Sequence, residues 1–197
     1  MKLNWAERMA VNNPIRPIQQ RIELSLLKRY VPLKPGGTIL EIGCGRGAGA
    51  ALIKTMFRPS RVHATDLDID MIRKAYTYLP RNQRTGITFC VADSTWLPFG
   101  SGSMDAVFGF GVLHHVPDWQ GALSEIARVL KPGGVYFFEE LYPLLYQNIL
   151  TRHILLHPTE NRFYSKDLKQ GLRKAGLELG ESLEIKKLVI LGVATKR

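Results

Sequence analysis

The sequence has few of the features that mark membrane-spanning, disulfide-stabilised or zinc-binding proteins. Its 197 residues include only two cysteines, Cys44 and Cys90, too few for a disulfide scaffold or a cysteine-based zinc cluster. It has no run of about eighteen apolar residues, and its first residues lack the apolar stretch of a secretory signal. It also has no internal repeat and no low-complexity segment. These absences favour a single domain in the reducing cytoplasm, without a transmembrane segment.

Acidic residues are scarce relative to basic ones. There are 17 Asp and Glu against 27 Lys and Arg, which gives a formal net charge of +10. Such a balance suits nucleic acid, anionic lipid or an acidic partner. The basic residues are dispersed, however, and lack the interleaved aromatic residues of a base-stacking surface. We therefore predict a solvated basic surface. Nucleic acid is not favoured, peripheral membrane contact stays open, and nothing indicates the oligomeric state.

The most informative stretch is residues 38–47, which read TILEIGCGRG. An apolar, β-rich run ends in three alternate glycines, Gly43, Gly45 and Gly47, and small helix-compatible residues follow. A strand, a tight glycine turn and a helix N-terminus together hold a nucleotide-like ligand at the carboxyl end of a parallel sheet. The exposed N–H groups of such a turn favour a carboxylate or a phosphate. The alternative is a tight strand-to-helix connection that binds nothing.

Strand and helix patterns alternate after this stretch. They predict elements in the order 61–65, 69–78, 88–91, 105–110, 119–130 and 135–139. Such alternation is typical of an α/β protein with a doubly wound parallel sheet. Two later strands, 177–183 and 188–194, are joined by a link too short for a crossover helix. We expect them to pair antiparallel, as a hairpin at one edge of the sheet.

Helical patterns flank this core. Before it, a short helix at 4–11 and a longer one at 17–30 are expected, and the longer helix has one apolar face formed by Ile15, Ile18, Ile22, Leu26 and Tyr30. After it, a helix runs over 165–175, with Ser165 as its N-cap and Asp167 in its first turn.

Acidic residues stand at the ends of two predicted strands. Asp66 closes the second strand, where a carboxylate can accept both hydroxyls of a ribose. Asp93 follows the third strand and can receive the amino group of an adenine. Leu67, Ala92 and Trp96 offer apolar surface to the ring. The neighbouring Asp68 and Asp70 are expected only to cap the following helix.

These motifs together resemble a known family. The motifs are EIGCGRG from Glu41, the acidic strand end at Asp66, Ala92-Asp93-Ser94 followed by Leu97-Pro98-Phe99, VLHHV from Val112, and LKPGG from Leu130. In this order they are similar to class I S-adenosylmethionine-dependent methyltransferases, over roughly residues 38–140. The similarity extends to the small-molecule branch that includes quinone-biosynthesis C-methyltransferases. It implies a Rossmann-like, seven-stranded sheet with six strands parallel and the last antiparallel.

The resemblance implies that the donor is S-adenosyl-L-methionine and the product S-adenosyl-L-homocysteine. Gly43 and Gly45 would then let the loop backbone approach the methionine carboxylate, and Glu41 would orient the loop and hold the methionine ammonium, directly or through water. NAD is disfavoured, because the third glycine is misplaced for a dinucleotide fingerprint and no second nucleotide-binding half follows.

The remaining cofactor contacts follow the same resemblance. Asp66 would bind the ribose and Leu67 would pack on the adenine. Asp93 would receive the adenine amino group, with the Ser94 backbone beside it. The main chain at Gly109 and Phe110 would face the ammonium and the sulfonium.

Fewer sequence features indicate which residues take part in catalysis. Methyl transfer from a sulfonium is intrinsically favourable, so holding an acceptor in line is much of the work. If a base is needed, His115 is our first candidate and His114 the second, because both follow the fourth strand. The alternative is that this pair only lines the pocket. No third ligand accompanies it, so we predict no metal site. Glu139, Glu140 and Tyr142 are further candidates for the pocket wall.

We therefore expect one methyltransferase domain over residues 1–197 with four parts. These are an N-terminal helical cap, the cofactor-binding core, a lid or acceptor-pocket segment, and a C-terminal helix and hairpin, at 1–34, 38–140, 141–164 and 165–197. The predicted reaction is methyl transfer to a small, partly apolar acceptor. One rival is a non-catalytic S-adenosylmethionine-binding module that regulates a partner, which would tolerate loss of His115. The other is an RNA or protein methyltransferase, which would bind polyanions with steep salt dependence.

Overall fold

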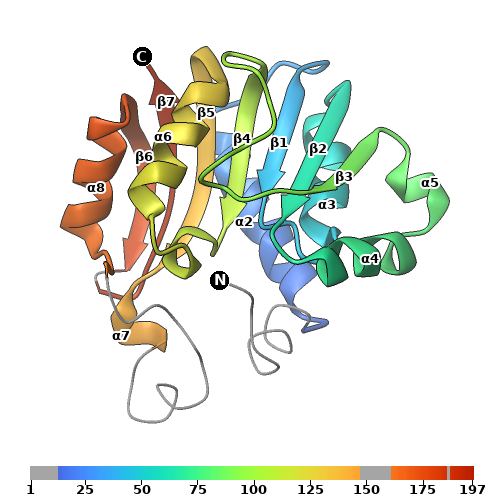
Figure 1. The fold of residues 1–197 in the computed structure, drawn as a ribbon, viewed down its shortest axis with the longest axis horizontal. Helices are drawn as coiled ribbons and strands as arrows, with labels where there is room; N and C mark the ends of the chain where they lie inside the picture. The colour runs from blue at the N-terminus through green and yellow to red at the C-terminus, as the bar shows by residue number, and fades with distance from the viewer. Residues whose placement is uncertain (1–12, 147–160, 186) are drawn as a thin grey trace.

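The computed structural model describes residues 13–146, 161–185 and 187–197. The helix predicted at 4–11 and most of the predicted lid segment, including Arg152, His153 and His157, lie outside the described residues. The remainder forms one sheet covered by helices on both faces (Figure 1).

The sheet has seven strands in the order β3-β2-β1-β4-β5-β7-β6. The strands are β1 Thr38–Ile42, β2 Arg61–Asp66, β3 Ile87–Val91, β4 Met104–Phe110, β5 Leu130–Leu141, β6 Leu177–Ile185 and β7 Val189–Lys196. Strands β1 to β5 pair parallel with one another, and β7 is antiparallel to both β5 and β6, so β6 runs in the same direction as the first five strands. The predicted fold class is confirmed, including the hairpin at the sheet edge.

Helices divide between the two faces of this sheet. They are α2 Arg16–Tyr30, α3 Ala48–Phe57, α4 Ile69–Tyr78, α5 Arg81–Arg84, the 3₁₀ helix η1 Leu113–His115, α6 Trp119–Val129, α7 Pro143–Tyr146 and α8 Ser165–Lys174. One apolar core lies under α2, α3 and α4, and the other lies under α6, α8 and η1. The chain reverses its strand order between β1 and β4, which opens a crevice at the carboxyl ends of the strands.

Helix α2 is oriented differently from what its apolar pattern suggests. Ile15, Ile18 and Ile22 are 64%, 63% and 59% exposed, whereas Gln20 and Glu23 are buried. Leu24 and Leu27 fill the core beneath the helix, next to α3. The face that the sequence pattern marks as apolar therefore points largely to solvent. The side that packs inward is instead the one that carries Leu24, Leu27 and the buried polar residues Gln20 and Glu23.

Two local boundaries also differ from expectation. Strand β5 begins at Leu130 rather than at 135, because the Lys-Pro-Gly-Gly segment is a bulge inside the strand and does not precede it. Helix α8 is capped by Tyr164 rather than by Ser165, and the Tyr164 N–H donates to Asp167 Oδ2 at 2.9 Å. Asp68 does cap α4 as expected, since its side chain accepts from the Asp70 N–H at 3.0 Å.

Candidate active site

The glycine turn between β1 and α3 has the backbone geometry that its sequence requires. Gly43, Gly45 and Gly47 have φ angles of 64°, 53° and 82°, a region that residues with a Cβ rarely adopt. A Cβ on Gly43 would lie 2.5 Å from Cγ2 of Val112. The turn therefore brings its main chain against the segment after β4 at a distance that only glycine allows.

Asp66 holds this turn from the end of β2. Its Oδ2 accepts the Gly45 N–H at 2.8 Å, and its Oδ1 accepts the Asp68 N–H at 2.9 Å. The carboxylate thus supports the glycine turn and also faces the crevice.

A first cavity, the β2–β3 cavity, lies beside Asp66 and has a volume of about 310 Å³. Most residues predicted to bind the cofactor line it, namely Gly43, Gly45, Asp66, Leu67, Ala92, Asp93, Ser94 and Phe110. Asp93 accepts both the backbone and hydroxyl hydrogens of Thr95 on Oδ1, at 2.9 and 2.8 Å. Its second oxygen, Oδ2, takes part in neither bond.

A second cavity, the α2–β5 cavity, has a volume of about 330 Å³. Its polar wall includes Arg16, Gln20, His114 and Glu139, and its apolar wall includes Phe110, Leu141, Leu145 and Tyr146. The two cavities share five lining residues, Gly43, Gly45, Phe110, Gly111 and His115. Of the histidines that the structure describes, His115 alone lines both cavities.

His114 and Glu140 form a buried pair behind this junction. Glu140 Oε1 accepts the N–H groups of Val112 and Leu113 at 3.2 and 2.8 Å, and Oε2 accepts that of His114 at 3.3 Å. The Nδ1 atom of His114 lies 2.8 Å from the same Oε2. The ring of His114 stacks on Tyr146, with centroids 5.3 Å apart. One carboxylate therefore orders the whole 3₁₀ turn that carries both histidines.

Glu139 points to the opposite face of β5 from Glu140. Its Oε2 accepts from Nη2 of Arg16 at 2.5 Å, while Nη1 of Arg16 donates to Glu23 Oε1 at 3.1 Å. Burial and the nearby Glu139 raise the pKa of Glu23 to about 7. This cluster joins the N-terminal end of α2 to the end of β5, across one side of the α2–β5 cavity.

Two residues predicted to bind the cofactor line neither cavity. Gly109 packs between Ile42 and Tyr136. Glu41 is buried behind the first turn of α3, where a Cβ on Gly49 would overlap its carboxylate. Burial, together with the nearby Asp66, raises the pKa of Glu41 to about 8. Its Oε2 has no hydrogen-bond partner within the part of the chain that the structure describes.

Sequence reasoning did not find the α2 contribution to the site. Arg16 and Gln20 lie in a helix whose pattern places isoleucines, not polar residues, on one face. The partly buried Arg16 was not detectable as a site residue because its partner Glu139 is 123 positions away. Tyr142, expected in the pocket wall, is fully buried instead, and its hydroxyl donates to Glu184 at 2.9 Å.

None of the described helices combines the length and apolar character needed to cross a bilayer.

Comparison with known proteins agrees with this geometry. A family model described as a methyltransferase domain matches residues 40–138, which is half of the chain. The fatty-acid O-methyltransferase of Mycolicibacterium smegmatis is 35% identical over 108 residues, covering 55% of this chain and 38% of that protein. The sterol 24-C-methyltransferase ERG6B of Gibberella zeae is 29% identical over 161 residues, covering 80% and 37%. The chain therefore spans less than half the length of these curated relatives.

Among solved structures, a SAM-dependent methyltransferase from Aquifex aeolicus has the same fold. It aligns with a TM-score of 0.79 and 19% identity, over 100% of both chains. The narrower similarity to quinone-biosynthesis enzymes stays a prediction. The family model, the sheet order and the glycine turn agree, and the chain belongs to the class I S-adenosylmethionine-dependent methyltransferases.

Proposed function

We propose that this chain transfers a methyl group from S-adenosylmethionine to a small, partly apolar acceptor. The observation that carries the proposal is the pair of cavities at the strand ends, which meet at Phe110, Gly111 and His115. Methyl transfer requires the donor sulfur and the acceptor atom to lie in line at short distance. Two adjoining cavities with a shared wall support such an arrangement, with the donor in one and the acceptor in the other.

The β2–β3 cavity fits the adenosine half of the cofactor. We assign the ribose hydroxyls to Asp66 and the adenine amino group to Oδ2 of Asp93, because both residues line this cavity and the bonds from Thr95 go to Oδ1 of Asp93. Leu67 and Ala92 provide apolar contact for the ring. The glycine turn lets the methionine part of the donor approach the main chain, at a place where a Cβ on Gly43 would collide with Val112.

Glu41 is suited to a supporting role near the methionine ammonium. It lies behind Gly49, and its buried Oε2 lacks a partner in the described residues. We propose that a water molecule links this oxygen to the ammonium. When bound, S-adenosylmethionine supplies the methyl group on a positively charged sulfur.

The α2–β5 cavity fits an acceptor that is apolar over much of its surface. Phe110, Leu141, Leu145 and Tyr146 provide the apolar wall, and His114, His115 and Glu139 provide polar groups at one side. Two relatives are named for a fatty acid and a sterol as acceptors. We propose an acceptor of this chemical kind, with a hydroxyl, carboxyl or activated carbon that enters the polar side.

We assign His115 the part of general base where the acceptor must lose a proton. It lines both cavities, so it can reach an acceptor atom next to the methyl group. We assign His114 a positioning part, because Glu140 holds its ring and its backbone within the 3₁₀ turn.

The test begins with calorimetric titration by S-adenosylmethionine, S-adenosylhomocysteine and NAD. We expect binding of the first two and not of the third. The protein is then incubated with methyl-labelled S-adenosylmethionine and a panel of fatty acids, sterols, quinones and RNA, and label transfer is measured. Transfer only to RNA would contradict the small-molecule proposal. Cofactor binding without transfer to any acceptor would favour a non-catalytic binding module, and binding of NAD alone would refute the donor assignment.

A further inference from the structure

The outer face of α2 and the residue before it carry an apolar stripe that no other described part of the chain covers. Ile15, Ile18 and Ile22 follow one another at three- and four-residue spacing, so they lie on one side of the helix. They are 64%, 63% and 59% exposed. Single exposed apolar residues are ordinary, but adjacent ones on a soluble protein mark an interaction surface.

Helix α2 is not apolar on every side. The opposite side of α2 buries Gln20 and Glu23 and directs Arg16 to Glu139. The helix thus places polar groups toward the site while it leaves three isoleucines in solvent. Exchanging them for polar residues would cost the folded core little, since none of the three belongs to a core cluster.

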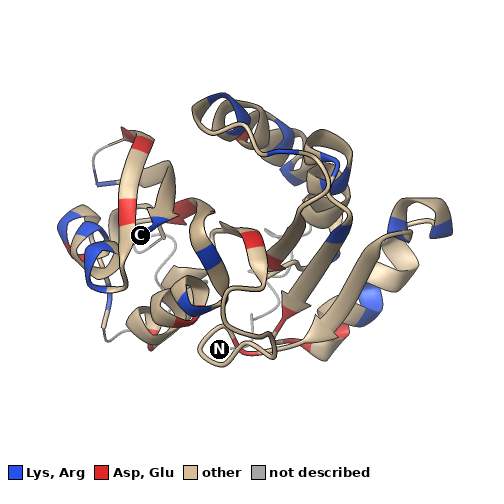
Figure 2. Ribbon diagram, turned by 90° about the horizontal axis from the view of Figure 1, so that it is seen from above, with Lys and Arg blue, Asp and Glu red and all other residues tan. Residues whose placement is uncertain are grey.

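The exposed charges of α2 itself have one sign. The only acidic residue of α2, Glu23, is buried, whereas Arg21 and Arg29 are exposed. Lys28 is also exposed, but its Nζ donates to the Met56 carbonyl. Figure 2 shows the helices on this side of the sheet banded mainly with Lys and Arg. The outer face of α2 therefore combines apolar and cationic groups.

Apolar and cationic groups side by side favour some binding partners of this face over others. A second copy of the chain would bring the same cations, and two net charges of +10, against each other. An anionic lipid surface complements both parts of the face, because isoleucines enter the headgroup region and arginines pair with the lipid charges. We propose that the outer face of α2, formed by Ile15, Ile18, Ile22, Arg21 and Arg29, docks on an anionic lipid bilayer.

The outer face of α2 lies close to the α2–β5 cavity. Pro17, Gln19 and Gln20 of the same helix line the α2–β5 cavity. At the same end of the sheet, α7 exposes Leu144 and Leu145 by 54% and 40%, and Leu145 lines that cavity too (Figure 1). Docking would bring the acceptor cavity close to the membrane surface. The docking itself does not depend on the proposed methyl transfer.

The experiment is flotation of the full chain with lipid vesicles. One set contains phosphatidylcholine alone, and the other contains phosphatidylcholine and phosphatidylserine at a ratio of about 7 to 3. We expect the protein to float with the second set and not with the first, and to bind less as salt is raised. Absence of binding to the anionic vesicles would overturn the proposal.

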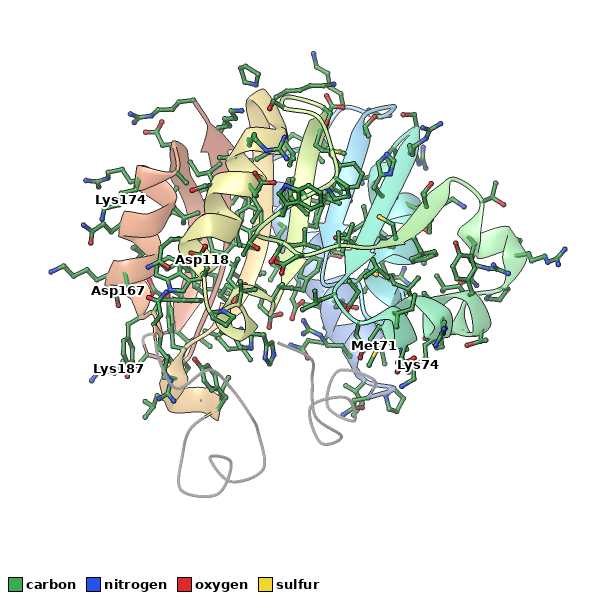
Figure 3. All side chains as sticks on the ribbon, viewed as in Figure 1. Met71, Lys74, Asp118, Asp167, Lys174 and Lys187 are labelled. Carbon is green, nitrogen blue, oxygen red and sulfur yellow. The ribbon has the colours of Figure 1, made fainter. Side chains whose placement is uncertain are left out.

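Substitutions on the outer face of α2 test whether this face is the one that binds the vesicles. Ile18→Ser with Ile22→Ser should weaken binding about tenfold or more, because two apolar side chains no longer enter the lipid. Arg21→Ala with Arg29→Ala should weaken it about twenty-five-fold, at about fivefold for each cation. The matched controls are Ile185→Ser, an exposed isoleucine on β6, and Arg173→Ala with Lys174→Ala on the outer side of α8, where Figure 3 labels Lys174.

Equal losses in the controls and in the α2 variants would overturn the assignment, because they would indicate binding by overall charge. Sedimentation equilibrium of the free protein provides a second check. A stable dimer that Ile18→Ser with Ile22→Ser dissociates would assign the face to a second copy instead. Binding of S-adenosylhomocysteine, measured for every variant, verifies folding and separates this proposal from the methyl-transfer proposal.

Discussion

The Nδ1 atom of His114 lies 2.8 Å from Oε2 of Glu140, and their side chains are only 3% and 0% exposed. Glu140 also accepts three backbone N–H groups from the turn that carries His114 and His115. A buried carboxylate with this many donors is difficult to replace, because each lost bond leaves a buried polar group unsatisfied. The position of the candidate base thus depends on a residue that touches neither cavity.

Glu140→Gln should therefore destabilise the protein by about 2–4 kcal/mol, since the amide presents a donor where the carboxylate accepts. Urea unfolding measures the change. Glu181→Gln, an exposed glutamate on β6, is the control and should change the free energy of unfolding little. A Glu140→Gln variant as stable as the control would refute the structural part assigned to this carboxylate.

His115→Ala should lower kcat by about 10²–10⁴-fold toward an acceptor that must lose a proton. Its affinity for S-adenosylhomocysteine and its stability should change much less. The readout is the pH profile of kcat, whose acidic limb should disappear in the variant. His63→Ala, on β2 away from both cavities, is the matched control. An unchanged profile would assign His115 to the pocket wall alone.

Asp66→Ala should weaken S-adenosylhomocysteine binding by about tenfold or more, because hydrogen bonds to a charged group are lost and the Gly45 N–H loses its acceptor. Calorimetric titration of the folded variant measures this. Asp70→Ala, in the first turn of α4, removes a nearby carboxylate outside the cavity and should leave affinity unchanged. Equal affinity of Asp66→Ala and wild type would exclude the ribose contact.

Gly43→Ala should cost about 2–4 kcal/mol, because its φ of 64° is strained for alanine and the added Cβ meets Val112. Gly133→Ala is the control, since Gly133 also has a positive φ but has nothing within 4 Å of the added Cβ. It should cost about 1 kcal/mol, from backbone strain alone. Denaturant unfolding of both variants separates the cost of backbone strain from that of the contact with Val112. Equal losses in the free energy of unfolding would rule out a contribution from the contact.

Glu41→Gln should change how stability depends on pH. The pKa of Glu41 is raised to about 8 in the folded protein, chiefly by burial, and is about 4.3 in an unfolded chain. Between these values the folded state binds more protons than the unfolded state, so the free energy of unfolding falls as pH rises. Wild type should lose on the order of 3–5 kcal/mol through this group between about pH 4 and pH 8.

In the Glu41→Gln variant that contribution is absent, so its Tm should fall less steeply over the same range. Glu23, whose pKa is raised to about 7, adds a slope of the same sign to both proteins and cancels in the difference. Thermal unfolding at intervals across the range provides the comparison. Parallel curves for the two proteins would show that Glu41 is charged in the folded state.

The local sequence pattern was sufficient to predict the strands, the glycine turn and the carboxylates at the strand ends. Positive φ at Gly43 and Gly45 follows from a short turn between a strand and a helix, and Asp66 and Asp93 face the crevice because they end parallel strands. These features depend on neighbours in sequence and on the common direction of the strands. They were therefore predictable before the fold was known.

The order of the strands, the glycine turn and the place of the two histidines after β4 could all be predicted from residues close together in the chain. Only the tertiary structure decided that α2 buries Gln20 and Glu23 and exposes Ile18 and Ile22. It also decided that Glu139 joins Arg16 while Glu140 holds His114. The physical reason is that the preferred side of a helix depends on partners distant in the chain. An ion pair between residues 123 positions apart produces no pattern in the local sequence, whereas a glycine turn does.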